Sequence, residues 1–331
     1  MMWARDIKKR PKREDRMKYI LIFILLFPSS LNAAWQSTDK KTPDESVNIN
    51  TYSGEAIKAY LWYPENFQAE KANKKYKAVV MAHGCGGAHY KDESDKWTAP
   101  YVAGKYKVWG KLLNEQDIVV MLVDSFSTRD DNGDVGGGVC DTSDPLDRPD
   151  KIDPVSVRPA DIAAGISYIK SRSDFQTDKV GVFGFSNGGT STLVLANHEN
   201  LIERSNALKE SGKKWFDLPF NEAYRADLFV ALYPGCGLNG YSAATRDIFN
   251  DLFLTYTDTF LYIASDDTSL PANTKEKCQS LRLLDAEKTF DSPNMKMKVV
   301  VNTDHQFDYY EADEQPVKET IERILALFES M

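Results

Sequence analysis

The chain has 331 residues, of which 42% are hydrophobic and 27% are charged. This is the composition of an ordinary globular protein that can bury a sizeable core, and it sets the chain apart from disordered proteins. The formal net charge is −8, so the composition gives no basic surface of the kind that binds nucleic acid.

The N-terminal segment has the pattern of a secretory signal peptide. Lys18 precedes a short apolar run, Ile20–Phe27, and small residues follow up to Ala33. An apolar run of this length cannot cross a hydrocarbon core that needs about 20 residues, so we expect no stable membrane anchor. No cysteine lies near the boundary, which argues against a lipoprotein. We expect export to a periplasm or to the outside of the cell, with cleavage after Ala33.

Residues 1–16 are unusual ahead of such a segment, because they carry seven basic and three acidic side chains. Either the basic region of the signal peptide is long or the true start is Met17, and we prefer the second interpretation. A nucleic-acid-binding arm is the functional alternative, but export explains a basic run beside an apolar segment better. Residues 1–33 carry eight basic and three acidic side chains, so their removal would change the net charge from −8 to −13.

The rest of the chain alternates between strand-like and helix-like apolar patterns. Strands are predicted over residues 46–50, 57–63, 78–83, 118–124, 179–183, 227–233, 259–264 and 296–301. Helices are predicted over residues 101–115, 159–171, 190–197 and 314–329. The first two strands should form an antiparallel pair. The alternation that follows predicts an α/β fold with a mostly parallel sheet, helices on both faces, and one domain over residues 34–331.

Three longer connections could shape a binding pocket. Residues 128–154 are rich in Asp and Gly but lack a full calcium-loop pattern, so we interpret them as a solvated loop. Residues 203–225 include several aromatic side chains and could form a short lid, although such aromatics pack internally as readily as they contact a substrate. Residues 237–257 could close the other side.

The most informative motif is Gly184-Phe185-Ser186-Asn187-Gly188, which lies between a predicted strand and a predicted helix. A Gly-x-Ser-x-Gly turn in this context holds its serine in a strained conformation above the edge of the sheet. The N-terminus of the following helix favours developing negative charge there. The alternative is a glycine-rich turn without a chemical role. The context favours Ser186 as a nucleophile.

A serine nucleophile needs a histidine base, which is normally oriented by a carboxylate. The chain has four histidines, at positions 83, 89, 198 and 305. Two precede Ser186, and His198 should be carried away from the serine by the helix. His305 follows the last predicted strand, so it should stand at the carboxyl edge of the sheet. We predict His305 as the base, the alternative being a surface histidine.

The acid should follow the preceding strand, where Asp266 and Asp267 are adjacent. Adjacent residues on an extended segment point in opposite directions, so only one of them can face the histidine. We favour Asp267 over Asp266, because a small residue three positions before the acid and a proline four positions after it are the usual sequence context of such a catalytic acid.

Several motifs together resemble the dienelactone hydrolase family of the α/β-hydrolase superfamily. The matching segments are 81–87, 123–126, 184–189, 233–236, the stretch from Asp266 to Cys278, and 304–308. The resemblance runs from about residue 75 to the C-terminus and implies an α/β-hydrolase fold and ester-type hydrolysis. The chain departs from the founding enzymes, which use cysteine where Ser186 stands here. Dienelactone is therefore not implied as the substrate.

The glycine-rich turn His83–Gly87 has the position of an oxyanion-binding loop. Backbone N–H groups there would stabilise the charge of a tetrahedral intermediate, and glycines allow close approach. We predict the N–H groups of Asn187 and Cys85 as the donors, with Gly84 as the next choice for the second. An ordinary tight turn is the alternative. His83 is interpreted as positioning this loop and not as a second base.

The four cysteines all lie in the predicted mature chain, and an even number in an oxidising compartment suggests disulfides. No Cys-x-x-Cys pair is present, so a metal site is not expected. Sequence alone allows three connectivities or four free thiols. The expected strand neighbours favour Cys85–Cys140 and Cys236–Cys278.

These predictions converge on an exported serine hydrolase that cleaves carboxylic ester or lactone bonds of small molecules through an acyl-enzyme, with no cofactor. An exported peptidase or a polyester-degrading esterase would use the same triad. A non-catalytic binding protein on this fold is a further alternative, although it would not need the complete set of nucleophile, base and acid.

Overall fold

The computed structural model of the protein describes residues 41–89, 102–130, 139–140, 147–173, 175, 179–197, 224–238, 255–288, 294–310 and 314–331. The predicted signal peptide lies outside these residues. Of the three connections predicted to shape a pocket, most of 203–225 and 237–257 and about half of 128–154 also lie outside them.

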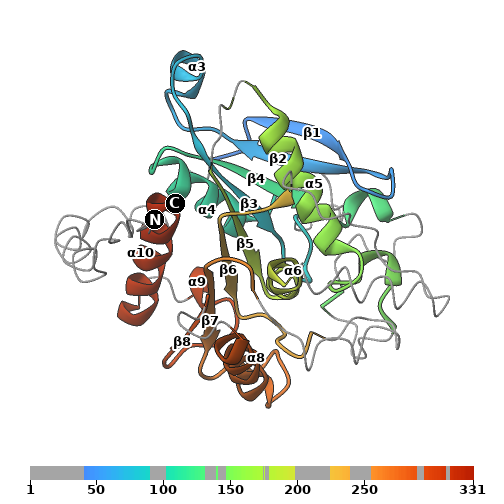
Figure 1. Ribbon diagram of the computed structural model, residues 1–331, viewed down its shortest axis with the longest axis vertical. Coiled ribbons are helices and arrows are strands. Elements are labelled where there is room, and N and C mark those ends of the chain that lie inside the picture. The colour runs from blue at the N-terminus through green and yellow to red at the C-terminus, as the bar shows by residue number, and fades with distance from the viewer. Residues whose placement is uncertain are drawn as a thin grey trace, which may run out of the picture.

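The core of the molecule is an eight-stranded sheet in the order β1-β2-β4-β3-β5-β6-β7-β8 (Figure 1). The strands are β1 (Glu45–Asn50), β2 (Ala56–Trp62), β3 (Lys77–Ala82), β4 (Ile118–Asp124), β5 (Lys179–Phe185), β6 (Leu228–Leu232), β7 (Thr259–Ala264) and β8 (Met295–Val300). The β1–β2 and β2–β4 pairs are antiparallel, and all other pairs are parallel. The predicted mostly parallel sheet is therefore confirmed, and the strand boundaries differ from the prediction by at most two residues.

Helices cover both faces of the sheet (Figure 1). The longer ones are α4 (Gly104–Asn114), α5 (Arg158–Ser171), α6 (Asn187–Ala196), α8 (Thr274–Lys288) and α10 (Gln315–Ser330), and α3 (Phe67–Glu70) and α9 (Phe307–Tyr310) are single turns. Apolar side chains of α4 and α10 pack against one face, and those of α5 and α6 pack against the other.

Strand β5 shows why the sequence produces this layering. Val180 and Val182 face α5 and α6, whereas Phe183 and Phe185 face α4 and α10, as the two-residue period of a strand requires. Gly181 leaves room for α10, because a Cβ atom there would lie 2.8 Å from the ring of Phe328. Both faces are buried, which is typical of a central parallel strand.

Helix α4 begins later than the sequence predicted. Val102 forms an isolated antiparallel bridge with His89, and the N–H of Ala103 donates to the carbonyl of Ala88 at 2.9 Å. These extended residues hold the entry to the helix against the two residues that follow the glycine-rich turn, so helical geometry starts at Gly104.

Two disulfides join loops near the carboxyl ends of the strands. Cys85, after β3, is bonded to Cys140, which follows β4, and Cys236, after β6, is bonded to Cys278 in α8. This is the connectivity that the sequence favoured. Each bond ties one strand-end loop to a second segment of the chain.

The order of the strands reverses between β3 and β5. From β3 the chain passes through α4 to β4 on one side, and β5 then pairs with β3 on the other side. In open α/β sheets the crevice at such a reversal, at the carboxyl ends of the strands, is the usual place for ligands. The turn after β3 and the turn after β5 meet there.

Among the helices of the described residues, none is both long enough and apolar enough to cross a bilayer.

Candidate active site

Ser186 occupies the sharp turn between β5 and α6. Its backbone has φ 51° and ψ −115°, which is strained for a residue with a side chain. The N–H of Ser186 donates to the carbonyl of Leu232 in β6 at 2.9 Å, and its own carbonyl accepts from Thr190 at 2.9 Å. The strand on one side and the helix on the other therefore hold the conformation.

The glycines of the motif are required by packing. A Cβ atom on Gly184 would lie 2.2 Å from Thr192 Oγ1 and 2.4 Å from the carbonyl oxygen of Gly188. A Cβ atom on Gly188 would lie 2.2 Å from the carbonyl oxygen of Ala82, in β3. Only glycine allows α6 to start this close to the sheet, and this closeness fixes where Ser186 stands.

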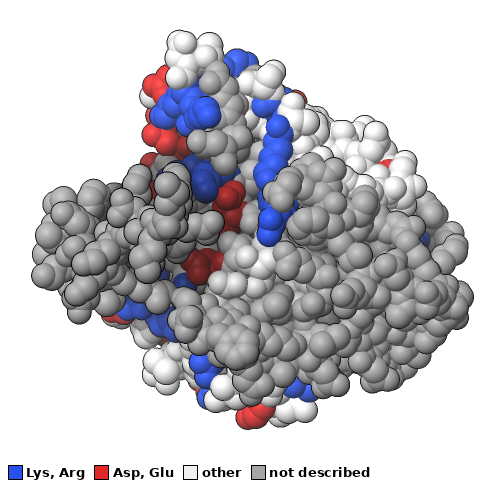
Figure 2. All heavy atoms as spheres, in the orientation of Figure 1, with Lys and Arg blue, Asp and Glu red and all other residues white. Residues whose placement is uncertain are grey.

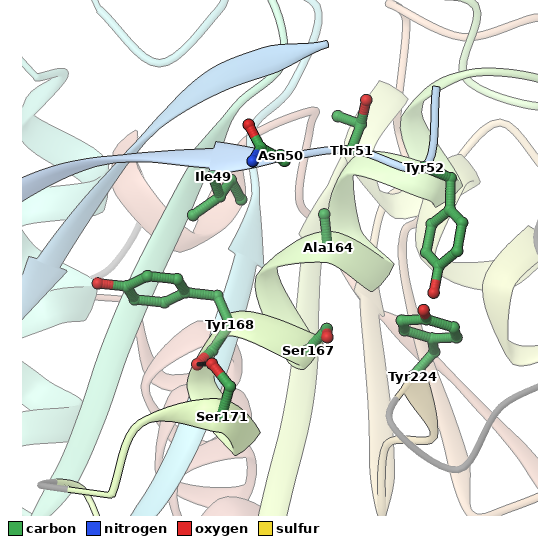
Figure 3. Close-up of a pocket in the computed structure, with 9 residues that line it drawn as sticks. All are labelled: Ile49, Asn50, Thr51, Tyr52, Ala164, Ser167, Tyr168, Ser171 and Tyr224. Atoms are coloured by element: carbon green, nitrogen blue, oxygen red, sulfur yellow. Dashed lines mark hydrogen bonds between the residues drawn. The ribbon is translucent and has the colours of Figure 1, made fainter. Parts of the chain in front are cut away.

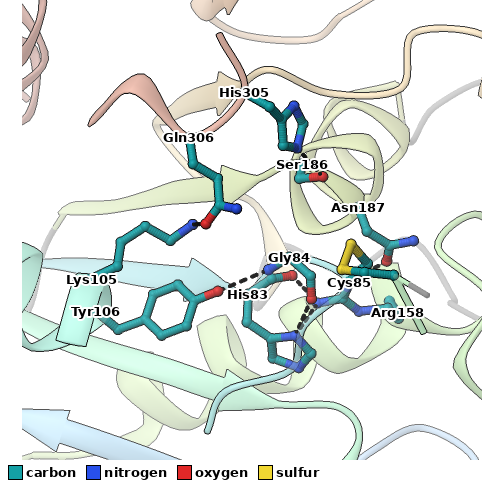
Figure 4. Close-up of a disulfide and its surroundings, with 11 residues drawn as sticks. His83, Gly84, Cys85, Lys105, Tyr106, Arg158, Ser186, Asn187, His305 and Gln306 are labelled. Carbon is teal, nitrogen blue, oxygen red and sulfur yellow. Dashed lines mark hydrogen bonds between the residues drawn. A yellow bond between two sulfur atoms is a disulfide. The ribbon is translucent and has the colours of Figure 1, made fainter. Parts of the chain in front are cut away.

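The structure brings the predicted serine, histidine and aspartate together. His305 Nε2 lies 2.9 Å from Ser186 Oγ (Figure 4), and His305 Nδ1 lies 2.7 Å from Asp267 Oδ2. The side chains of His305 and Asp267 are 9% and 7% exposed, respectively. Serine, imidazole and carboxylate thus form a shielded hydrogen-bonded chain across the ends of β5, β7 and β8.

Asp267 and Asp266 have different surroundings. Asp267 Oδ1 accepts from the N–H groups of Ser269 and Leu270 at 3.0 and 3.2 Å, which leaves Oδ2 directed at the imidazole. Asp266 is exposed, and its Oδ2 lies 3.0 Å from the hydroxyl of Ser265. Asp267, and not Asp266, is therefore the carboxylate that contacts His305.

Asp304 links the loop of the acid to the loop of the histidine. Its Oδ1 accepts from the N–H of Thr268 at 3.0 Å and from the N–H of His305 at 2.7 Å. These two N–H donors lower the pKa of Asp304. The N–H of Asp266 also donates to the carbonyl of Thr303 at 2.9 Å, so the two loops are joined at two points beside the Asp267–His305 contact.

The glycine-rich turn after β3 lies beside Ser186 (Figure 4). The N–H of Gly84 donates to Tyr106 Oη at 3.0 Å, so that donor is already engaged, and Cys85 is the next residue. Asn187 is the first residue of α6, and the N-terminus of a helix favours negative charge. These contacts favour Cys85 over Gly84 as the partner of Asn187 in holding an anion.

His83 is a neutral structural side chain. Ser125 N–H donates to its Nε2 at 3.2 Å, so the proton is on Nδ1, which donates to the carbonyl of Gly84 at 2.8 Å. Burial and the nearby Arg158 charge lower its pKa to about 3. His83 therefore joins the β3 turn to the β4 loop and cannot accept a proton from Ser186 near neutral pH.

A second histidine–aspartate pair lies nearby, and no serine or cysteine among the described residues is hydrogen-bonded to its imidazole. His89 Nε2 lies 2.9 Å from Asp124 Oδ2 and 3.1 Å from Tyr60 Oη. Ser127 Oγ donates to the same carboxylate at 2.5 Å and not to the imidazole. A serine held by the carboxylate has no base in this geometry, so we interpret the cluster as structural. The remaining histidine, His198, lies outside the described residues.

Sequence reasoning missed a set of side chains that surround the triad. They are Lys105, Tyr106, Arg158, Tyr233 and Gln306. The ring of Tyr233 packs against that of His305 with centroids 4.6 Å apart, and Tyr106 accepts from Gly84. Tyr233 and Gln306 lie in the matching segments 233–236 and 304–308, but the motifs gave them no role. Lys105, Tyr106 and Arg158 are identified by their place in the fold, because isolated Lys, Tyr or Arg residues on helices carry no motif.

Lys105 is buried on the opposite side of the site from Arg158 (Figure 4). Its Nζ lies 3.2 Å from Gln306 Oε1 and 3.3 Å from Tyr233 Oη. Tyr233 in turn donates to Asp308 Oδ1 at 2.5 Å. Burial lowers the pKa of Lys105, and the charge of Asp308 opposes this effect. The network fixes Gln306, the residue next to His305.

A pocket of about 380 Å³ lies elsewhere on the molecule (Figure 3). It is lined by the end of β1, the turn that follows it, the second half of α5 and Tyr224. The strand β1 is at the opposite edge of the sheet from β8. The pocket therefore shares no residue with the Ser186 site and is not its substrate cavity.

Charges over α3 are paired locally. Figure 2 shows basic and acidic side chains side by side over α3, where Lys74 lies 3.1 Å from Glu70 and 3.0 Å from Asp117. Exposed pairs of this kind contribute little stability. They do neutralise each other, so this region presents no field of one sign.

Three solved structures illustrate what the chain is similar to. An esterase from Pyrobaculum calidifontis is 17% identical, with 96% of this chain and 92% of that chain covered and a TM-score of 0.51. A proposed dienelactone hydrolase from Klebsiella pneumoniae is 18% identical, with 87% and 99% covered and a TM-score of 0.54. EstE1, a thermostable carboxylesterase cloned from a metagenomic library, is 15% identical, with 91% and 92% covered and a TM-score of 0.51.

No family model matches the chain, and no curated protein matches it in sequence. At these identities the solved structures establish the fold. The chain has the α/β-hydrolase fold, as the resemblance in its motifs implied.

Proposed function

We propose that this protein is a serine hydrolase that cleaves carboxylic ester bonds of small molecules through an acyl-enzyme. The observation that carries the proposal is the hydrogen-bonded chain from Ser186 through His305 to Asp267, at a strained turn and at the point where the strand order reverses. The esterases among the structurally similar proteins support this reaction class.

Acylation follows from the positions of the three side chains. His305 Nε2 takes the proton of Ser186 Oγ as the oxygen attacks the ester carbonyl. Asp267 accepts from Nδ1–H, which fixes the tautomer and stabilises the imidazolium that forms. The carbonyl oxygen becomes an oxyanion held by the N–H groups of Asn187 and Cys85. When the intermediate collapses, His305 gives its proton to the leaving alcohol.

Deacylation repeats these steps with water as the nucleophile. His305 removes a proton from water, which attacks the acyl carbonyl, and Ser186 leaves with the proton returned by the imidazole. Every step uses groups of the chain and water. The same steps open a lactone ring, in which case the leaving alcohol stays attached to the acyl group.

The proposal extends to the family, the domain extent and the location of the protein. We propose that the chain is related to the dienelactone hydrolases, which its motifs resemble, although it has Ser186 at the position of their cysteine. We propose a mature single-domain protein of residues 34–331, exported to an oxidising compartment. Two disulfides and the N-terminal pattern of residues 17–33 support export.

The first test is Ser186→Ala in the mature protein. We expect loss of p-nitrophenyl acetate hydrolysis and of covalent labelling by a fluorophosphonate, because both need the serine oxygen. Thr190→Ser, one turn along α6, is the control and should keep both. Labelling of the Ser186→Ala variant at another residue would rule out Ser186 as the nucleophile. A panel of acyl chain lengths, lactones, peptides and polyesters on the wild type would then define the substrate.

A further inference from the structure

Arg158 contacts both segments that carry the proposed oxyanion donors. Its Nη1 donates to Asn187 Oδ1, and its Nη2 donates to the carbonyl of His83 at 2.6 Å. Asn187 is itself one proposed donor, and His83 is two residues before the other, Cys85. One guanidinium therefore bridges the turn after β3 and the N-terminus of α6 (Figure 4).

Arg158 is held firmly enough to act as a fixed bridge. The side chain is almost fully buried, and the guanidinium carbon lies 5.1 Å from the centroid of the Phe126 ring. Its backbone N–H donates to the carbonyl of Asp153 at 3.0 Å at the start of α5. A planar guanidinium presents several donors in a rigid fork, so two acceptors on different segments are held at a set separation.

The position is unfavourable for a residue that serves only helix α5. Arg158 is its first residue, where the helix dipole disfavours positive charge. The buried Arg129 offers a comparison, because its guanidinium forms a bidentate pair with the Asp161 carboxylate at 2.7 and 2.8 Å. Arg129 thus pairs with a carboxylate of α5. Arg158 bonds oxygens of the two site segments.

We infer that Arg158 is a positioning residue that sets the separation of the Asn187 and Cys85 N–H groups. The inference rests on the proposed function for its catalytic consequence. An oxyanion hole stabilises charge only when its donors are already in place, and these two donors are on different segments. Loss of the bridge lets the β3 turn and the α6 N-terminus move apart. The N–H donors bind the charged transition state more strongly than the neutral ester of the ground state. Loss of their alignment should therefore lower kcat and change KM little.

The test compares Arg158→Met and Arg158→Lys with the matched variants Arg129→Met and Arg129→Lys. A displacement of about 1 Å at a catalytic site can cost about 100-fold, so we expect Arg158→Met to lower kcat about 10- to 100-fold. Arg158→Lys should be intermediate, since an ammonium reaches one acceptor well and not two. Affinity for a boronic acid inhibitor, which mimics the tetrahedral intermediate, should fall in parallel with kcat.

The Arg129 variants control for a general loss of stability. They are expected to unfold at lower temperature but to keep kcat and boronate affinity per folded molecule. Equal kcat in the Arg158 variants and the wild type would overturn the inference. So would a parallel loss in the Arg129 variants, because the effect would then follow stability.

A second readout does not depend on activity. Amide hydrogen exchange of peptides spanning residues 83–87 and 186–189 should be faster in Arg158→Lys than in the wild type and unchanged in Arg129→Lys. Unchanged exchange in both would also overturn the inference. An inactive wild-type protein would refute the proposed function, and the exchange result would still decide whether Arg158 holds the two segments together.

Discussion

Asp266 and Asp267 are neighbours of identical chemistry, and their surroundings alone separate them. One carboxylate is exposed beside Ser265, and the other is shielded and contacts the imidazole of His305. The backbone N–H groups of Ser269 and Leu270 satisfy one oxygen of Asp267. Oδ2, the other oxygen of Asp267, is therefore the one that contacts His305 Nδ1.

Asp267→Ala is expected to lower kcat about 10³- to 10⁴-fold, because the imidazole loses the partner that fixes its tautomer. Asp266→Ala is the matched control, and its effect should stay within about twofold, as for an exposed side chain. Steady-state kinetics on p-nitrophenyl esters measure both. Similar losses in the two variants would show that the assignment of the acid is wrong.

At the scale of elements, the start of α6 is fixed by how closely it approaches β3. Gly188→Ala would place a methyl group 2.2 Å from a backbone oxygen of β3, and a backbone atom cannot yield as a flexible side chain can. We expect this variant to lose more than about 4 kcal/mol of stability or to fail to fold.

Gly54→Ala is a suitable comparison for Gly188→Ala. Gly54 has φ +80°, and a Cβ atom there would meet nothing within 4 Å. The loss of stability should therefore come only from the strain of a positive φ in a residue with a side chain, about 1–2 kcal/mol. Thermal unfolding of the two variants measures the difference. A Gly188→Ala protein as stable as Gly54→Ala would contradict the packing argument for the elbow.

The two disulfides should differ in what they do for activity. Each closes a loop of similar length, with sequence separations of 55 and 42 residues, so removal of either should cost roughly 3–4 kcal/mol. Only the first includes Cys85, which carries a proposed oxyanion donor. The carbonyl of Cys85 also accepts from Val139 N–H at 2.7 Å, next to the bonded Cys140.

We expect a double serine variant of Cys85 and Cys140 to lose kcat even where it is folded. The corresponding variant of Cys236 and Cys278 should lose stability but keep kcat per folded molecule. Denaturant unfolding and kinetics at a temperature where both are native separate the two effects. Equal kcat in the two variants would mean that the first disulfide does not hold the donor in place.

At the scale of the whole molecule, the buried polar side chains between strand-end loops make the fold sensitive to acid. His83 is buried as a neutral imidazole whose pKa is lowered from 6.5 to about 3. In the unfolded chain the same imidazole gains a proton below pH 6.5. The contribution of His83 to the free energy of unfolding is therefore fully present above pH 6.5. It decreases as the pH falls toward 3, because the unfolded chain then binds a proton that the folded chain does not.

His83→Gln should make the free energy of unfolding less dependent on pH in this range. One pKa unit corresponds to about 1.4 kcal/mol, so the wild type should lose roughly 2–3 kcal/mol more than the variant between pH 7 and pH 4.5. Denaturant titrations at the two pH values give both free energies. The same loss in both proteins would indicate that the imidazole is not the group responsible.

Local sequence was enough to predict the strands of the sheet and the helices α4, α5, α6 and α10, although α4 begins later than predicted. The run Ile118–Asp124 is buried along its length, and alternation in β5 assigns valines to one face and phenylalanines to the other. The Gly-x-Ser-x-Gly turn and the order of Ser186, Asp267 and His305 along the chain identified the candidate triad. Both can be read from the sequence, because the turn depends on neighbouring residues and the order is that of the chain itself.

Contacts between segments far apart in the chain decided the rest. Arg158 follows Cys85 by 73 positions and precedes Asn187 by 29, yet it bonds the segments of both. No motif marks Arg158, because its role depends on the position of its N–H donors in the folded structure and not on the residues next to it in the sequence. The engagement of Gly84 by Tyr106, and the choice between two adjacent aspartates, likewise depend on the packing of helices and loops over the sheet. The sequence thus determined which residue types could carry out the chemistry, and the tertiary structure decided which of them are held in position to do so.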